Sequence, residues 1–68
     1  MPVPLGAFLK LAGAARSGGE AKQRVLAGDV WVNGEVERRR GRGLVDGDAV
    51  RIDATTWRVV ARDARARP

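Results

Sequence analysis

The stretch SGGEAKQRVLAGDVWVNGEV, residues 17–36, contains the signals for a helix start, a helix stop, a short strand and a tight turn. The Ser17 hydroxyl can accept the unpaired backbone amide of Glu20 while the Glu20 carboxylate reaches back, which is a capping box. Gly28 is typical of the left-handed position just past a helix end. These two signals predict a helix from about residue 18 to residue 27.

Upstream of this stretch, apolar residues recur at helical spacing and predict a first helix of roughly two to three turns. They are Leu5, Phe8, Leu9, Ala12 and Ala15. Gly13 weakens this helix by about 1 kcal/mol relative to alanine, which indicates either a close approach by another backbone or an early end. Because the connection to the next helix is short, the two helices must pack as an antiparallel or angled pair.

The second predicted helix has an apolar face toward the first helix and a polar face toward solvent. We assign Ala21, Val25 and Leu26 to the apolar face, and Lys22, Gln23 and Arg24 to the polar face. After Gly28 the period changes from helical to alternating, so a strand is expected.

The alternation places Val30 and Val32 on one face of that strand and Trp31 on the other. Asn33 and Gly34 are the strongest short hairpin signal, and residues 35 to about 38 are expected to return as a second strand. Further on, VDGDAVRID predicts a turn at residues 46–48 and a strand with Val50 and Ile52 inward, and TWRVVA predicts a last strand.

The predicted architecture is therefore an α+β fold, with two packed N-terminal helices followed by a small, mostly antiparallel sheet. We expect a single domain over residues 1–62 and a frayed basic tail over residues 63–68. With 68 residues the core must be small, because so short a chain buries only about 60% of its unfolded surface. The chain has no cysteine to support that core, which suits a reducing cytoplasm.

The chain carries thirteen Lys and Arg residues against eight Asp and Glu, a net charge of +5. That balance predicts attraction to polyanions, and arginine can hold a phosphate through two parallel hydrogen bonds. The base composition of the genome can produce the same excess of arginine, so charge alone does not identify a partner.

The catalytic inventory is small: there is no His, Cys or Tyr, and the single serine, Ser17, is assigned to a helix cap. No paired carboxylates are spaced to converge, and no glycine-rich loop matches a nucleotide-binding pattern. Residues 46–48 resemble the start of a calcium loop, but its remaining ligands are missing. We predict no catalysis, no cofactor and no metal.

The apolar run PLGAFLKLAGAA is interrupted by Lys10, and we expect neither a signal peptide nor a membrane span.

Taken in order, these signals resemble the S-four domain, an RNA-binding family named after ribosomal small-subunit protein four. The matching stretches are PLGAFLKLAGAARSGGEAKQRVLAGDVWVNGEV and DGDAVRI, within residues 4–52. Within that family the chain is most similar to small, stand-alone bacterial members with a SGGEAK helix start and an RRGR segment. The combination of Ser-x-x-Glu-Ala, a glycine eleven residues after Ser17, VxVNG and GDxV is specific, although each piece alone is weak.

The resemblance implies an L-shaped surface, made by the helix pair and the adjoining strand loop, that binds structured RNA. In such domains the start and exposed flank of the second helix face the RNA, together with basic residues nearby. Carried over by position, the RNA-binding residues are Lys10, Arg16, Ser17, Gly18, Gly19, Lys22, Gln23, Arg38, Arg39, Arg40 and Arg42. Many members carry basic residues where this chain has Pro4 and Gly18, and both differences remove usual phosphate contacts.

The electrostatics of a helix N-terminus indicates the same surface, independently of the resemblance. A helix N-terminus collects unpaired amides and the positive end of the helix dipole, and Gly18 and Gly19 let a phosphate approach the backbone. Glu20 competes with such a phosphate, because its carboxylate can fill the same position. An anion can therefore bind only beside the capping box.

Two features remain open to two interpretations each. The segment ERRRGR, residues 37–42, is either a solvated edge that discourages sheet pairing or a set of cations that bind phosphate. We favour phosphate, because four neighbouring arginines repel one another without helping the fold. Trp31 is either covered by Trp57 and the last strand in a second small core, or a stacking platform for an unpaired base. Trp57 itself is assigned to the core.

The sequence thus predicts a non-catalytic, monomeric, cytoplasmic module that recognises folded RNA, ribosomal or transfer RNA, through phosphate contacts and shape. A ribosomal subunit is a further candidate partner, and no membrane is expected. One alternative is a DNA-binding helix-turn-helix with residues 18–27 as its recognition helix. Another is a protein-interaction module with a ubiquitin-like sheet, since VNGEV and VDGDAVRI are similar to that sheet.

Overall fold

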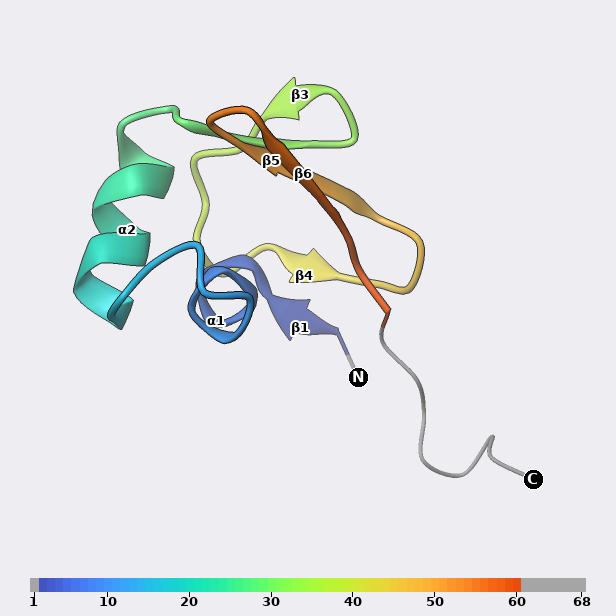
Figure 1. The fold of residues 1–68 in the computed structure, drawn as a ribbon, viewed down its shortest axis with the longest axis horizontal. Coiled ribbons are helices and arrows are strands. Elements are labelled where there is room, and N and C mark those ends of the chain that lie inside the picture. Colours follow the sequence, from blue (N-terminus) through green and yellow to red (C-terminus); the bar gives the residue numbers. More distant parts are fainter. Residues whose placement is uncertain (1, 61–68) are drawn as a thin grey trace.

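A computed structural model describes residues 2–60 of the chain. Two helices lie beside a four-stranded antiparallel sheet, and a second, two-stranded sheet lies next to the first helix (Figure 1). The predicted α+β fold, with its helices before the main sheet, is confirmed. The tail predicted at residues 63–68 lies outside the described residues.

Helix α1, Leu5–Leu11, buries Leu5 and Leu9 completely, while Phe8 is half-buried against the same core. The chain leaves the helix at Gly13, which has a φ of 79° and open space where a Cβ would lie. Of the two interpretations of Gly13, the early end is therefore the one observed. Ala15 is buried as predicted, but in the connection rather than in the helix.

Helix α2, Gly18–Leu26, begins where the capping box predicted. The Ser17 Oγ accepts a hydrogen bond from the Glu20 amide at 3.1 Å. The Glu20 carboxylate accepts from the Arg16 amide at 3.4 Å, one residue earlier than in the standard box. The helices pack at an angle, with α1 seen end-on and α2 from the side (Figure 1).

Two assignments on α2 were wrong. Leu26 is 55% exposed, because it lies about 100° around the helix from the buried Val25 and so turns away from α1. Arg24 is not a solvent-facing residue but half-buried, because two carboxylates hold it at the end of the helix. Ala21 and Val25 are buried as predicted, and Lys22 and Gln23 are exposed.

The main sheet has the strand order β3-β2-β5-β6, and every pair in it is antiparallel. Its strands are β2 Val30–Val32, β3 Glu35–Val36, β5 Ala49–Ile52 and β6 Thr55–Arg58. Asn33 and Gly34 both have positive φ, 52° and 85°, as a two-residue hairpin of this twist requires. Val50 and Ile52 are buried as predicted.

Strand β3 is shorter than predicted and ends at Val36. The amide of Glu37 still donates to the Val30 carbonyl at 2.9 Å. Beyond that bond the Glu37 side chain is buried, and the chain turns into a loop around it. The arginines that follow therefore lie in a loop and not in a returning strand, because the chain turns around a buried carboxylate.

A two-stranded sheet, not anticipated from the sequence, joins the N-terminus to the middle of the chain. Strand β1, Val3–Pro4, pairs antiparallel with β4, Gly43–Leu44. Just before β4, the carbonyls of Arg42 and Arg40 accept the amides of Leu5 and Gly6, each at 2.8 Å. Pro4 at the N-cap offers no side-chain hydrogen bond, so these carbonyls satisfy the first amides of α1 instead.

One apolar core is shared by both helices and both sheets. Leu5 and Leu9 of α1 meet Val25 of α2 there, and residues of β2, β4 and β5 close the other side. The buried residues are Leu5, Leu9, Ala15, Ala21, Val25, Val30, Val32, Leu44, Val50, Ile52 and Val59. The start of α1, the start of α2 and the loop before β4 are consequently held in a fixed arrangement.

Gly28 provides a test of how α2 ends. Its φ is 82°, and a Cβ there would lie 3.0 Å from a guanidinium nitrogen of Arg38. We expect Gly28→Ala to lower the free energy of unfolding by about 1–2 kcal/mol in urea denaturation, because an L-residue is strained at positive φ. Gly41→Ala is the matched control, since open space surrounds that position, and it should be close to neutral. Equal losses from the two variants would contradict this explanation.

Candidate nucleic-acid interface

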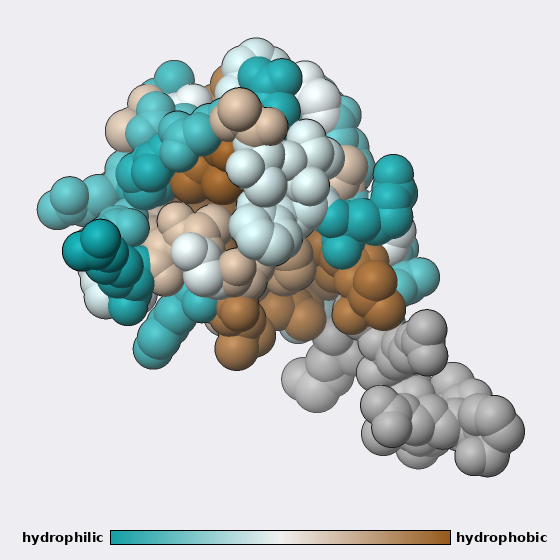
Figure 2. Space-filling model, in the orientation of Figure 1, coloured by the Kyte–Doolittle hydropathy of each residue, from teal (hydrophilic) through white to brown (hydrophobic). Residues whose placement is uncertain are grey.

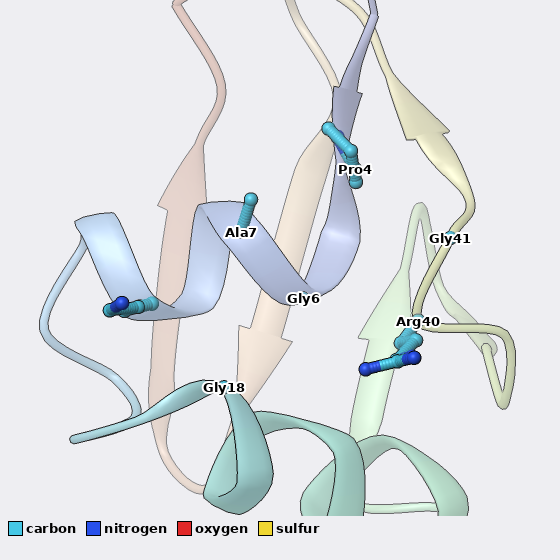
Figure 3. A pocket seen from close by; sticks show the side chains of 7 residues that line it. Pro4, Gly6, Ala7, Gly18, Arg40 and Gly41 are labelled. Atoms are coloured by element: carbon cyan, nitrogen blue, oxygen red, sulfur yellow. The ribbon is translucent and has the colours of Figure 1, made fainter.

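A hollow of about 240 Å³ lies where α1, the first residue of α2 and the loop before β4 meet (Figure 3). The residues that line it are apolar or small, except for two cations. The lining residues are Pro4, Gly6, Ala7, Lys10, Gly18, Arg40 and Gly41. Two segments that carry opposite ends of the predicted site, residues 10–18 and 40–41, therefore meet at one surface.

Three separate elements position the polar groups of this hollow. Lys10 projects from the last turn of α1, and Gly18 is the first residue of α2. Arg40 lies across the hollow from Ala7 with its guanidinium turned toward the space between the helices (Figure 3). Within residues 2–60 neither Lys10 nor Arg40 forms an ion pair, so both charges are available to an external anion.

The start of α2 adds backbone donors to this surface. Its side-chain cap satisfies the Glu20 amide, and in the described part of the chain no partner accepts from the amides of Gly18 and Gly19. A Cβ at Gly18 would meet no atom within 4 Å, so the backbone there is open to a ligand. These amides and the helix dipole favour an anion beside the box.

Arg16, Ser17 and Lys22 are exposed near the same end of α2, and Gln23 is exposed further along the helix. They do not line the hollow. Hydrophilic residues gather on the side of the molecule where α2 lies (Figure 2). This polar flank extends the surface that begins at the hollow.

The segment at residues 37–42 contains its own counter-anion. Glu37 is only 7% exposed, and its carboxylate accepts hydrogen bonds from Arg39 Nε and Arg42 Nη1, each at 3.0 Å. The backbone amide of Arg39 donates to the same carboxylate at 3.2 Å. The bonds from Arg39, followed by the bond from Arg42, lower the pKa of Glu37 to about 2. Two of the four arginines are thus paired with a carboxylate of the protein itself.

Arg38 points to the opposite end of α2. Its guanidinium packs where a Cβ of Gly28 would lie, just past the helix C-terminus. Arg24 is at the same end, bonded to Asp29 at 2.9 Å and to Asp53 at 2.7 Å. Cations are stabilised near a helix C-terminus by its dipole, so these two arginines have structural partners.

The structure therefore gathers only part of the predicted site. It brings Lys10, Gly18 and Arg40 together, and it separates Arg38, Arg39 and Arg42 from them. Glu37 was missed as a partner, although its position directly before three arginines was a usable signal. Gly6, Ala7 and Gly41 were also missed, because nothing local indicates that residue 41 lies near the start of α1.

Trp31 faces away from the main core, as alternation predicted, and of its two interpretations the cover by Trp57 is wrong. Trp57 pairs with Val50 and packs on the core face of the sheet, so it cannot cover Trp31. Arg51 lies over the indole instead, with its guanidinium carbon 5.2 Å from the ring centroid. The assignment of Trp57 to the core is confirmed.

Comparison with known proteins agrees with this fold. The family model described as S4 domain matches residues 1–60. The chain is also 49% identical over 51 residues to the probable ribosome maturation protein RlbA of Bacillus subtilis (strain 168), covering 75% of this chain and 72% of that protein. The chain belongs to the S4 domain family, the S-four family that the sequence motifs resemble, and its role is RNA-related.

Among residues 2–60, neither helix has the length and apolar character needed to cross a bilayer.

The Glu37 cluster gives the fold a defined response to acid. Because the folded pKa is lowered from 4.5 to about 2, the stabilisation is complete above pH 4.5 and is lost as pH falls toward 2. We expect it to be about 1–3 kcal/mol, reduced from the full shift because Arg39 is largely exposed. NMR titration of the Glu37 carboxyl carbon checks the value, and Arg42→Gln should move that pKa upward. If the pKa of Glu37 in Arg42→Gln were the same as in the original protein, the contact between Glu37 and Arg42 would be excluded.

Proposed function

We propose that this protein is a non-catalytic RNA-binding module that recognises folded RNA, and ribosomal RNA in particular, by phosphate contacts and shape. The observation that carries the proposal is the hollow in which Lys10 and Arg40 converge on the first residue of α2. Membership of the S4 domain family and the similarity to a probable ribosome maturation protein support it. Transfer RNA is the other folded RNA that the same contacts would accept.

The chemistry of the hollow suits a backbone phosphate. Two cations without internal partners in residues 2–60 flank it, and the Gly18 and Gly19 amides supply neutral donors. A phosphate there would gain charge-assisted hydrogen bonds as well as the helix dipole. The small lining residues allow a bulky ribose-phosphate chain to approach closely. Arg40 would offset the phosphate contacts that are lost because Pro4 and Gly18 replace basic residues common in the family.

The exposed flank of α2 would extend this contact along the RNA. Arg16, Lys22 and Gln23 are exposed on α2 or just before it, and Ser17 keeps the helix start ordered. Arg39 is 78% exposed although bonded to Glu37, so the exposed part of its guanidinium can reach a second phosphate while its bond to Glu37 remains. We assign Arg38 and Arg42 to a smaller, long-range electrostatic contribution, because they lie against Gly28 and Glu37.

The two alternative functions lose support. A DNA-reading helix would need Arg24 beside Lys22 and Gln23, and Arg24 is bonded to Asp29 and Asp53. A ubiquitin-like module begins its sheet at the first hairpin, whereas this fold places two helices before the hairpin. The protein-interaction alternative also leaves the cations of the hollow without a role.

The first test removes the two cations of the hollow together. We expect Lys10→Gln with Arg40→Gln to weaken binding to a ribosomal RNA fragment at every sequence tested. The slope of log affinity against log salt should fall by about 2, because two phosphates would no longer be neutralised by the protein. Fluorescence anisotropy across a salt series measures both quantities.

The matched control for that test is Arg38→Gln with Arg58→Gln, which also removes two charges but leaves the hollow intact. Its salt slope should change less. Gly18→Ala adds a separate test, because open space surrounds that position, so the fold should tolerate the change while the approach of a phosphate is hindered. Equal losses from both double variants would mean that net charge alone drives binding.

The second test concerns Glu37 and separates positioning from charge. Glu37→Gln removes one negative charge from a chain of net charge +5, so simple electrostatics predicts tighter RNA binding. We expect weaker binding, because the Glu37 bonds to Arg39 and Arg42 hold the turn that presents Arg40. Comparing the RNA affinities of Glu37→Gln and the original protein at equal salt shows whether binding becomes weaker or tighter. Circular dichroism confirms that the variant is folded. Tighter binding would refute the positioning role.

A further inference from the structure

The outer face of the main sheet carries one continuous row of side chains on the side away from the core. The strand registers pair Val36 with Trp31, Trp31 with Arg51, and Arg51 with Thr56. Residues directly opposite one another share a face of a sheet, so these four side chains lie side by side across all four strands. The neighbouring positions Val30, Val32, Val50 and Ile52 face the core instead.

The row contains a hollow of about 140 Å³ at its aromatic residue. Trp31, Arg51 and Thr56 line it, together with the small residues Gly34 and Ala49. Because glycine and alanine take little space, the half-buried indole stays accessible beside the hollow. The site therefore combines an aromatic surface, a hydroxyl group and a cation.

The cation of this site has no acidic partner in the described part of the chain. No carboxylate there forms an ion pair with Arg51, whose guanidinium carbon lies 5.2 Å from the centroid of the Trp31 ring. By contrast, Arg24, Arg39 and Arg42 are each bonded to carboxylates. The Trp31 contact holds the Arg51 guanidinium near the hollow while leaving its charge uncompensated.

From this arrangement we propose a second binding site, for one unpaired nucleotide of RNA, on the outer face of the sheet. The base stacks beside Arg51 on the indole of Trp31, the Arg51 guanidinium binds the attached phosphate, and the Thr56 hydroxyl bonds a polar edge. Charge complementarity favours a nucleotide over an apolar peptide segment. A paired base has both faces covered by its neighbours, so the site selects single-stranded RNA.

This inference rests on the proposed function, because it assigns the same class of ligand to a different face. The hollow at Lys10 and Arg40 involves the helices and the loop before β4, whereas this site lies on the sheet surface that faces away from the core. A rigid duplex on the first surface leaves the second one available. The two sites can therefore be tested separately on one protein.

The experiment measures the affinity of a short oligouridylate and of an abasic strand of the same length for Trp31 variants. Trp31→Ala should bind the oligouridylate about 5- to 150-fold more weakly, the factor that corresponds to the removal of one base stack. Trp31→Phe should retain most of the affinity, and it guards against a packing defect in the alanine variant. The abasic strand should bind the original protein and Trp31→Ala equally.

A Trp57→Phe background leaves Trp31 as the single tryptophan, so quenching of its fluorescence by oligouridylate reports stacking directly. Arg51→Gln should weaken both strands, because it removes a phosphate contact rather than the stack. Unchanged oligouridylate affinity in Trp31→Ala, or an equal loss with the abasic strand, would overturn the site and leave the row to a protein partner.

Duplex ribosomal RNA distinguishes the failure of this site from the failure of the proposed function. Trp31→Ala should bind the duplex as the original protein does, whereas Lys10→Gln with Arg40→Gln should not. If the duplex binds but Trp31→Ala leaves oligouridylate unaffected, this inference alone is wrong. If neither RNA binds the original protein at low salt, both proposals are wrong.

Discussion

Two backbone hydrogen bonds join the loop before β4 to the first turn of α1, and the position of the basic hollow follows from them. Leu5 and Gly6 donate to the carbonyls of Arg42 and Arg40, each at 2.8 Å. A helix that begins after proline has no side-chain cap of its own here, so without these carbonyls its first amides would need water. The same bonds place Arg40 beside α1 and next to the start of α2, which creates the hollow.

Glu37 gives that loop its shape, at an electrostatic cost that two arginines offset. Burying a lone carboxylate is unfavourable, and removing one partner from such a cluster costs more than the pair itself contributes. The bonds from Arg39 and Arg42 hold its pKa at about 2, so the charge persists at neutral pH. A run of arginines that looks uniform in the sequence thus divides into structural members and one member, Arg40, that faces the hollow.

The fold separates its cations by their partners as well as by position. At the end of α2, Arg24 joins two acidic residues, and Arg38 packs on Gly28. At the start of α2, the cations lack carboxylate partners within residues 2–60 and stand beside unpaired amides. The helix dipole favours this division, because its positive end attracts external anions and its negative end stabilises the protein's own arginines.

Elements whose signals act over a few residues could be predicted from the amino-acid order without any coordinates. The Ser17 cap, the stop at Gly28 and the Asn33–Gly34 hairpin depend on local hydrogen bonds and positive φ, so they and the family motifs were recognised directly. Three-dimensional packing was needed to establish which cations share a face, that β1 pairs with β4, and that Arg51 rather than Trp57 contacts the Trp31 ring. These three features bring together residues that are far apart in the chain. They depend on packing and charge pairing that no local pattern encodes.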